Sequence, residues 1–219
     1  MRHVLIIGVM ALIACTSCTI EQTYHFNSEF GGEFIQRIDY SMAQGLMQMG
    51  EDGETPGEEV ELTMLDDSTL TAIREEMAEI EGLKLLALTD ENSQISVHLA
   101  FENLEALNQA QEGNAESSED NQSYLRFHKD GNSLFIHFEI ENPGPGENEE
   151  GEPALNPEGS SEMFGMIQYH YQFNFANQIQ SVSGTPAEVG DDNKSLRVEL
   201  TLKDAMAEEF VNVLKVDFR

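Results

Sequence analysis

The sequence has few cationic residues, only two cysteines and no tryptophan. Only 11 of its 219 residues are Lys or Arg, against 41 Asp or Glu, so the formal net charge is -30. No Lys or Arg occurs between Lys129 and Lys194, a stretch that contains 12 acidic residues. Nucleic-acid binding draws much of its affinity from Lys and Arg that displace counterions from phosphate. The composition therefore argues against a nucleic-acid partner, and it disfavours direct docking on anionic lipid headgroups.

The sequence also lacks an apolar run long enough to span a bilayer, which takes about 20 residues. Its N-terminal run, Val4–Ala14, has 11 residues and follows a basic residue, Arg2. A basic start, a short apolar run and small residues next to cysteine are typical of a secretory signal peptide. We therefore predict that residues 1–14 are a signal peptide, which directs the protein out of the cytoplasm.

The two cysteines stand at the end of this signal. Leu12-Ile13-Ala14-Cys15 resembles a bacterial lipobox. That resemblance implies that the Cys15 thiol receives a diacylglycerol, that the chain is cut before Cys15, and that residues 15–20 form a lipidated tether. Cys18 is the alternative site, but it has Cys15 where a lipobox usually has Leu. A Cys15–Cys18 disulfide is a third possibility, although two intervening residues would make a strained ring.

Residues 21–218 are predicted to form a single domain, because 40% of the chain is hydrophobic and the length suits one core. Period-two alternation predicts strands, with a buried one at 83–89 and a central one at 167–175. The other strands are expected at 21–27, 34–40, 95–101, 123–129, 133–140, 196–202 and 213–218.

Three- and four-residue apolar spacing predicts helices over 42–49, 68–82 and 103–111. Asp67 or Ser68 is expected to cap the second of these, and Gly82 to end it. Helices are interspersed with hairpins, and no alternation of single strands and helices dominates. The predicted fold is α+β, a largely antiparallel sheet of about eight or nine strands with two or three helices packed on one side.

Three acidic segments interrupt this pattern, at 50–61, 113–122 and 141–162. The last contains four of the six prolines and seven Glu. Such a segment cannot bury enough apolar surface to offset its ordering entropy, so we expect 141–162 to be disordered and the other two to be exposed loops.

Several short stretches resemble a group of small Gram-negative envelope lipoproteins of uncharacterised function. They are Tyr24-His25-Phe26-Asn27, the Gly31-Gly32 turn, Ile38-Asp39-Tyr40-Ser41-Met42, residues 101–108 and residues 173–184. The chain is more distantly similar to the LppM-type lipoprotein domain. The LppM resemblance implies an α+β fold that can bind an apolar or lipid-like ligand.

Residues able to support chemistry are present but do not form a recognisable motif. A zinc site needs three or four ligands brought together, and the histidines show no such spacing. If Asp130-Gly131 centres its turn, His128 faces Ser133 and His137 faces Tyr124. We predict no metal, no cofactor and no catalytic residue. Met42, Leu46 and Met49 are weak candidates for an adaptable apolar ligand site.

The sequence predicts a non-enzymatic cell-envelope lipoprotein that serves as a binding or scaffolding module. Its predicted partner is the membrane, to which the lipid anchor attaches it. Thr16 stands after Cys15 in place of the Asp that retains lipoproteins in the inner membrane of enteric bacteria, which favours the outer membrane. The alternative is a carrier of an apolar ligand near 42–49. A third hypothesis is a hydrolase that uses carboxylates.

Overall fold

A computed structural model describes residues 19–41, 65–115, 123–140 and 167–219, apart from 206 and 208. The predicted helix at 42–49 and the acidic segments at 50–61 and 141–162 lie outside these residues, as does most of the segment at 113–122. The described part therefore tests the strands and two of the three predicted helices.

A seven-stranded sheet runs in the order β3-β4-β2-β1-β7-β10-β9. β1 pairs antiparallel with β2 on one side and parallel with β7 on the other. The strands are β1 (Thr19–Phe26), β2 (Gly32–Asp39), β3 (Leu83–Glu91), β4 (Gln94–Phe101), β7 (Gln168–Phe175), β9 (Glu188–Val189) and β10 (Ser195–Thr201).

A second sheet of four strands has the order β5-β6-β11-β8. Its strands are β5 (Ser123–Asp130), β6 (Ser133–Ile140), β8 (Ile179–Gly184) and β11 (Val213–Phe218). The prediction of a single sheet is therefore wrong. The alternation that begins in β7 is interrupted at residues 176–178, so β8 leaves the first sheet and pairs with β11.

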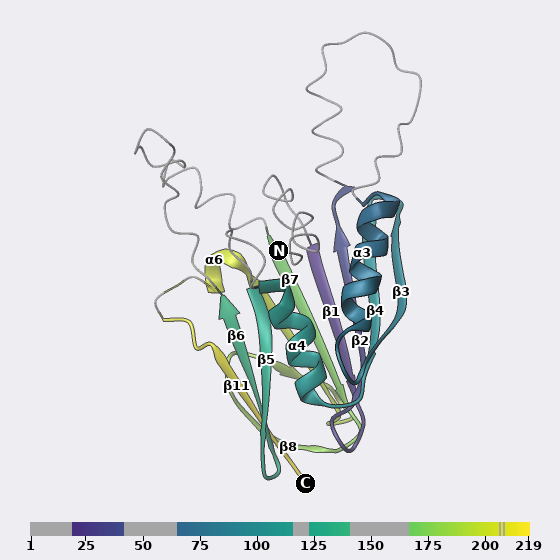
Figure 1. Cartoon of the computed structure of the whole chain (residues 1–219). Helices are drawn as coiled ribbons and strands as arrows, with labels where there is room; N and C mark the ends of the chain where they lie inside the picture. Colours follow the sequence, from purple (N-terminus) through teal and green to yellow (C-terminus); the bar gives the residue numbers. More distant parts are fainter. Residues whose placement is uncertain (1–18, 42–64, 116–122, 141–166, 206, 208) are drawn as a thin grey trace, which may run out of the picture.

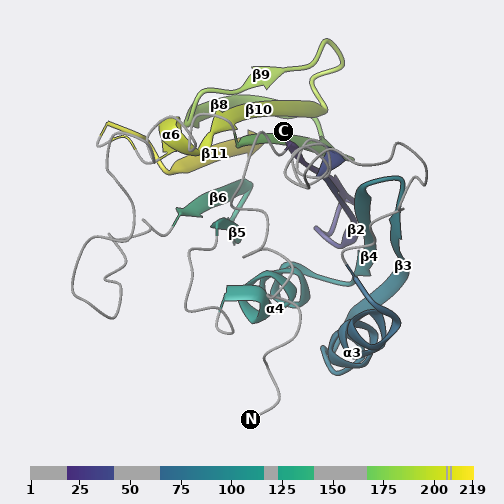
Figure 2. The ribbon, with the colours of Figure 1, turned by 90° about the horizontal axis from the view of Figure 1, so that it is seen from above.

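The second sheet and two helices lie along the same side of the seven-stranded sheet (Figures 1 and 2). α3 (Asp67–Ala78) packs near β3, and α4 (Leu104–Ala115) packs beside β5. A short helical turn, α6 (Leu202–Ala205), follows β10. The α+β class is confirmed, but the packing differs from the prediction because a second sheet shares this side with the helices.

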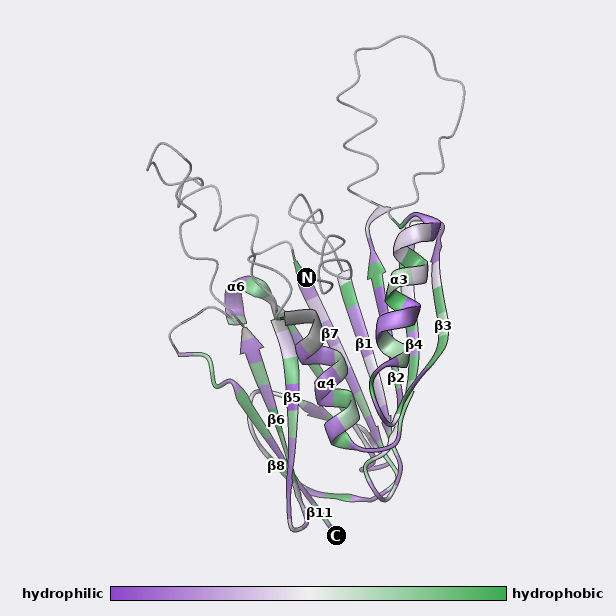
Figure 3. Cartoon of the chain, viewed as in Figure 1, coloured by the Kyte–Doolittle hydropathy of each residue, from purple (hydrophilic) through white to green (hydrophobic). Residues whose placement is uncertain are grey.

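Aromatic rings fill the space between the two sheets. Tyr24 lies at the centre, with ring centroids 4.8 Å from Phe34, 5.1 Å from Phe127 and 5.2 Å from Phe173. Phe34 and Phe173 are the register partners of Tyr24 on the two neighbouring strands. The period-two pattern in the sequence places these rings on one face, as the alternating bands along the strands show (Figure 3). Ring contacts of this kind add to the free energy of apolar burial.

The ends of two elements differ from the sequence-based expectations. Asp66, not Asp67 or Ser68, caps α3, because its carboxylate accepts a hydrogen bond of 2.7 Å from the Thr69 amide. α3 ends at Ala78, and Gly82 lies in the turn before β3 with a φ of 80°. The cap was misplaced by one residue because Asp66, Asp67 and Ser68 are all good N-cap residues.

The β5–β6 turn is also shifted by one residue. Asp130 pairs with Ser133, so Gly131 and Asn132 form the two-residue turn. Gly131 has a φ of 57°, which glycine adopts without strain. Consequently His128 pairs with Phe135 and His137 pairs with Arg126, contrary to the predicted partners.

α4 covers the outer edge of β5 with side-chain amides. Asn108 accepts a 2.9 Å hydrogen bond from the Phe127 amide, and its own amide donates one of 2.9 Å to the Phe127 carbonyl. One turn later, the buried Gln111 accepts a 2.9 Å hydrogen bond from the Leu125 amide. These contacts satisfy edge groups that would otherwise be open to another strand.

We expect Asn108→Ala to leave the Phe127 amide and carbonyl without these partners. The loss should be about 1–3 kcal/mol in the free energy of unfolding, the usual cost of partly buried groups that lose their hydrogen bonds. Amide hydrogen exchange resolved at Phe127 should become faster than in the parent protein. Gln109→Ala, a change at the exposed neighbour, is the matched control. Equal exchange rates in the two variants would contradict this role of Asn108.

Candidate functional site

None of the site residues predicted from the sequence lies among the described residues. Cys15 and Cys18 precede β1, and Met42, Leu46 and Met49 fall between β2 and α3. The structure therefore neither brings these residues together nor separates them. The first described strand, β1, starts at Thr19, which is one residue after Cys18 and four after Cys15.

The five histidines among the described residues lie on the outer faces of the two sheets. His25 and His98 alternate with inward-facing residues of β1 and β4, and His98 Nε2 is 3.1 Å from Glu33 Oε2. Over the ranges that the structure describes, no group of three or more His, Cys, Asp or Glu is placed to hold a metal ion. Within the same ranges, no helix is long and apolar enough to cross a membrane.

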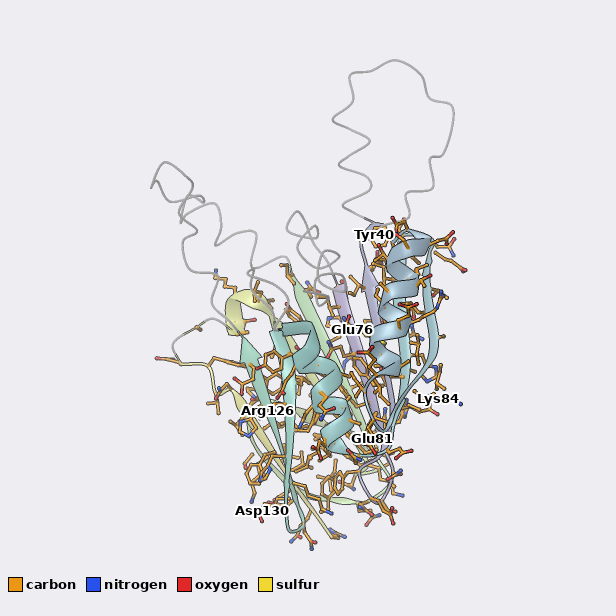
Figure 4. The ribbon with its side chains drawn as sticks, in the orientation of Figure 1. Tyr40, Glu76, Glu81, Lys84, Arg126 and Asp130 are labelled. Atoms are coloured by element: carbon orange, nitrogen blue, oxygen red, sulfur yellow. The ribbon has the colours of Figure 1, made fainter. Side chains whose placement is uncertain are left out.

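A shallow groove of about 680 Å³ follows β3, the outermost strand of the seven-stranded sheet. Arg74 and Ala78 of α3 line one wall, and residues 83–89 line the other. Lys84 lies on the outer edge (Figure 4), and Leu86 is 42% exposed. The expectation that 83–89 is a buried strand is wrong, because β3 has a hydrogen-bonded neighbour on one side only.

The register of β3 shifts between Leu85 and Ala87, so one residue of the strand has no partner in β4. An irregularity of this kind bends an edge strand and makes it a poorer template for another chain. The exposed Lys84 has the same effect. The groove thus combines apolar contact area with two cationic side chains, Arg74 and Lys84, along a protected edge.

A second groove, of about 560 Å³, lies between α4 and β5. Arg126 and Lys129, which line it, already have partners within the chain. Arg126 Nε is 3.4 Å from a carboxylate oxygen of Glu112, and Lys129 Nζ stands 4.8 Å from the centroid of the Phe30 ring. Because these cations are held by neighbours within the chain, the second groove offers less charge to a ligand than the groove along β3.

Asp90 is a buried carboxylate, 9% exposed, at the end of β3. Its two oxygens accept hydrogen bonds of 2.6 Å from the Tyr40 hydroxyl and 2.7 Å from the Leu65 amide. Tyr40 follows β2 and Leu65 precedes α3, so Asp90 ties together the two points between which residues 42–64 run. This carboxylate has a structural task, which makes it a poor candidate for acid–base chemistry.

A chain of buried polar groups runs through the aromatic core. The Tyr24 hydroxyl donates to Gln22 Oε1 at 2.6 Å and accepts from Gln111 Nε2 at 2.9 Å. Burial raises the pKa of Tyr24 well above its usual value, so the hydroxyl stays protonated at physiological pH. The network therefore joins β1 to α4 through neutral hydrogen bonds.

Sequence reasoning missed this network, although a signal for it exists. Gln22 on β1 and Gln36 on β2 occupy inward positions, where the apolar–polar alternation of these strands predicts an apolar residue, and both are 8% exposed. Gln111 continues the helical spacing of Leu104 and Leu107. A polar residue at a position that should be apolar indicates a buried hydrogen bond or a functional group.

On the outer face of the second sheet, Asp217 of β11 collects three partners. Lys215 Nζ lies 2.8 Å from its carboxylate, and the hydroxyls of Ser133 and Ser181 donate hydrogen bonds of 2.5 and 2.7 Å. Lys215 and the two hydroxyls hold the pKa of Asp217 well below its usual range. The three strands β6, β11 and β8 are thereby linked through one carboxylate.

This arrangement predicts a pH dependence of stability. The lowered pKa of Asp217 in the folded state means that its contribution is fully present above the unfolded pKa, about 3.9. The contribution is lost as the pH falls below that value toward the folded pKa. Urea unfolding between pH 5 and pH 2 should therefore show a smaller loss of stability for Asp217→Asn than for the parent. Asp191→Asn, in an exposed turn, controls for net charge, and identical pH profiles for all three proteins would contradict the prediction.

Comparison with known proteins returned one similar solved structure of note. No protein-family model and no curated protein matches the chain. The NMR structure of the folded domain of LppM from Mycobacterium tuberculosis is similar at 10% sequence identity and a TM-score of 0.44, over 93% of this chain and 90% of that one. This is the domain type to which the sequence shows a distant resemblance. No match supports the resemblance to the Gram-negative group.

Proposed function

We propose that this protein is a cell-envelope lipoprotein, a non-enzymatic binding or scaffolding module held at the membrane by acyl chains on Cys15, with Cys18 as the alternative. The observation that supports it best joins sequence and fold. The lipobox-like segment ends at Cys15, and the first strand of the sheet begins at Thr19. Only three residues stand between Cys15 and Thr19 in the sequence, so an anchor at Cys15 would hold this strand close to the bilayer.

The charge of the protein supports a covalent anchor over direct adsorption. With 41 acidic and 11 basic residues, the chain has no surplus of cations to attract anionic headgroups. Each buried methylene of an acyl chain stabilises attachment by about 0.8 kcal/mol, and several chains together make it durable. The outer membrane is the proposed location, because the residue after Cys15 is Thr16 rather than Asp.

The interior of the described domain supports a binding or scaffolding role over chemistry. Its one buried carboxylate among the described residues, Asp90, is engaged by Tyr40 and Leu65. The space between the sheets is filled by rings in mutual contact, among them Tyr24, Phe127 and Phe173. The proposed contact surface is therefore on the outside, and the groove along β3 is the best candidate.

Mass spectrometry of the protein extracted from membranes in detergent tests this proposal. We expect an N-terminal peptide that begins at Cys15 and has the added mass of a diacylglycerol. A chain that still begins at Met1 with free thiols would overturn the lipoprotein assignment. If a small apolar molecule stays bound through purification in a fixed molar ratio to the protein, the carrier function is favoured over the scaffolding function.

A further inference from the structure

The elements of the seven-stranded sheet define two distinct ends of the domain. Thr19, the first residue of β1, pairs with Asp39 at the end of β2 and with Gln168 at the start of β7. Gln168 pairs in turn with Thr201 at the end of β10. We call this end, marked by these four residues, the tether end. At the opposite end, Phe26 pairs with Gly32 and Phe175, and we call it the turn end.

The same polarity extends to the other elements. β5 begins and β6 finishes at the register pair Ser123–Ile140, while their short turn lies at Asp130–Ser133. Figure 1 shows the start of β5, the end of β6 and the start of α3 at the end where β1 begins. β5, β6 and α3 therefore share the two ends that the seven-stranded sheet defines.

The length of the tether is small compared with the length of the domain. Four peptide units separate Cys15 from Thr19, which reach at most about 14 Å, and one unit separates Cys18 from Thr19. β1 has eight residues and spans about 26 Å. An anchor this short holds Thr19 close to the bilayer while the turn end can stand well away from it.

We propose that the tether end faces the lipid bilayer, with β1 pointing away from it. The proposal rests on the lipid anchor of the proposed function. It assigns the membrane as the partner of one end of the domain and leaves the edge of β3 and the turn end open to the surrounding compartment. A domain that lies flat on the outer face of its sheet is the competing arrangement.

Two positions along one strand give a matched test. Gln168 starts β7 at the tether end, Gln178 lies three residues past the end of β7 at the turn end, and both are exposed. The background is the acylated protein in which the native cysteine that is not acylated is changed to serine. Two variants of this background, Gln168→Cys and Gln178→Cys, are each labelled with the same fluorophore at the introduced cysteine. The labelled proteins are reconstituted into phosphatidylcholine vesicles that contain a lipid with a nitroxide headgroup, which quenches at short range.

We expect severalfold stronger quenching at position 168 than at position 178. Equal quenching, or stronger quenching at 178, would overturn the orientation.

Flotation of the same vesicles separates this proposal from the one on which it rests. Protein that floats with the vesicles but shows equal quenching retains its anchor and has the wrong orientation. Protein that fails to float, with no acyl mass on either native cysteine, overturns the anchor and the orientation together.

Discussion

Cys15→Ser should abolish acylation and move the protein from the membrane fraction to the soluble fraction. Serine has no thiol to accept the diacylglycerol, so the variant has no acyl chains to hold it at the membrane. Since an acyl chain contributes about 0.8 kcal/mol per buried methylene, removal of the chains changes the partition between membrane and water by several orders of magnitude. Fractionation by ultracentrifugation, followed by intact-mass measurement, checks this expectation.

Cys18→Ser is the matched control, because it removes the same atom three residues downstream. We expect this variant to keep its acyl mass and to stay in the membrane fraction. The reverse result, with Cys15→Ser acylated and Cys18→Ser soluble, would place the anchor on Cys18. Membrane association of the double variant would contradict a lipid anchor at either cysteine.

Phe173→Ala should cause a large loss of stability, because it removes a ring from the centre of the aromatic core. The Phe173 side chain is fully buried and lies between Tyr24, Tyr171 and Phe127. Truncation of a buried Phe to Ala costs about 3–5 kcal/mol through lost contacts and the cavity that remains. A domain is stable by only about 5–15 kcal/mol, so a large share of the total is lost. Urea unfolding of the unacylated protein, followed by circular dichroism, measures the effect.

Phe135→Ala makes the same substitution on the outer face of the second sheet. Phe135 is half-buried, with Lys215 5.8 Å from its ring centroid, and its loss should cost less than half as much. Comparable losses for the two variants would show that the space between the sheets is not the principal core.

Strands with one polar face were predictable from the sequence, and their pairing was only partly so. The alternation in β1, β4, β7 and β10 gives the correct strands within a few residues. Alternation reports which face a side chain occupies, but it does not report which strand lies next to it. For that reason the sequence did not predict three features: the parallel pairing of β1 with β7, the division into two sheets and the edge position of β3.

The site was less predictable than the fold for a different reason. The anchor was inferred from a local motif at Cys15, which does not depend on tertiary structure. The contacts of Gln111, by contrast, join α4 to Leu125 on β5 and to Tyr24 on β1. Tyr24 and Gln111 are 87 residues apart in the sequence. A single sequence does not indicate which distant residues are in contact, and the one signal for this contact is an unexpected polar residue at an inward position.

The parallel pairing of β1 with β7 also constrains when the protein can fold. Thr19 has Gln168 as its partner, so the 149 residues up to Gln168 must be synthesised before this ladder can begin. Contacts so distant in sequence form slowly, because closing the long intervening loop costs conformational entropy before the contacts stabilise the fold. The β1–β2 hairpin, whose partners are at most 20 residues apart, can form early, but the other edge of β1 stays unpaired until β7 is made. Until β7 is available to cover β1, the nascent polypeptide is therefore expected to be most vulnerable to proteases and to pairing with other chains at this edge.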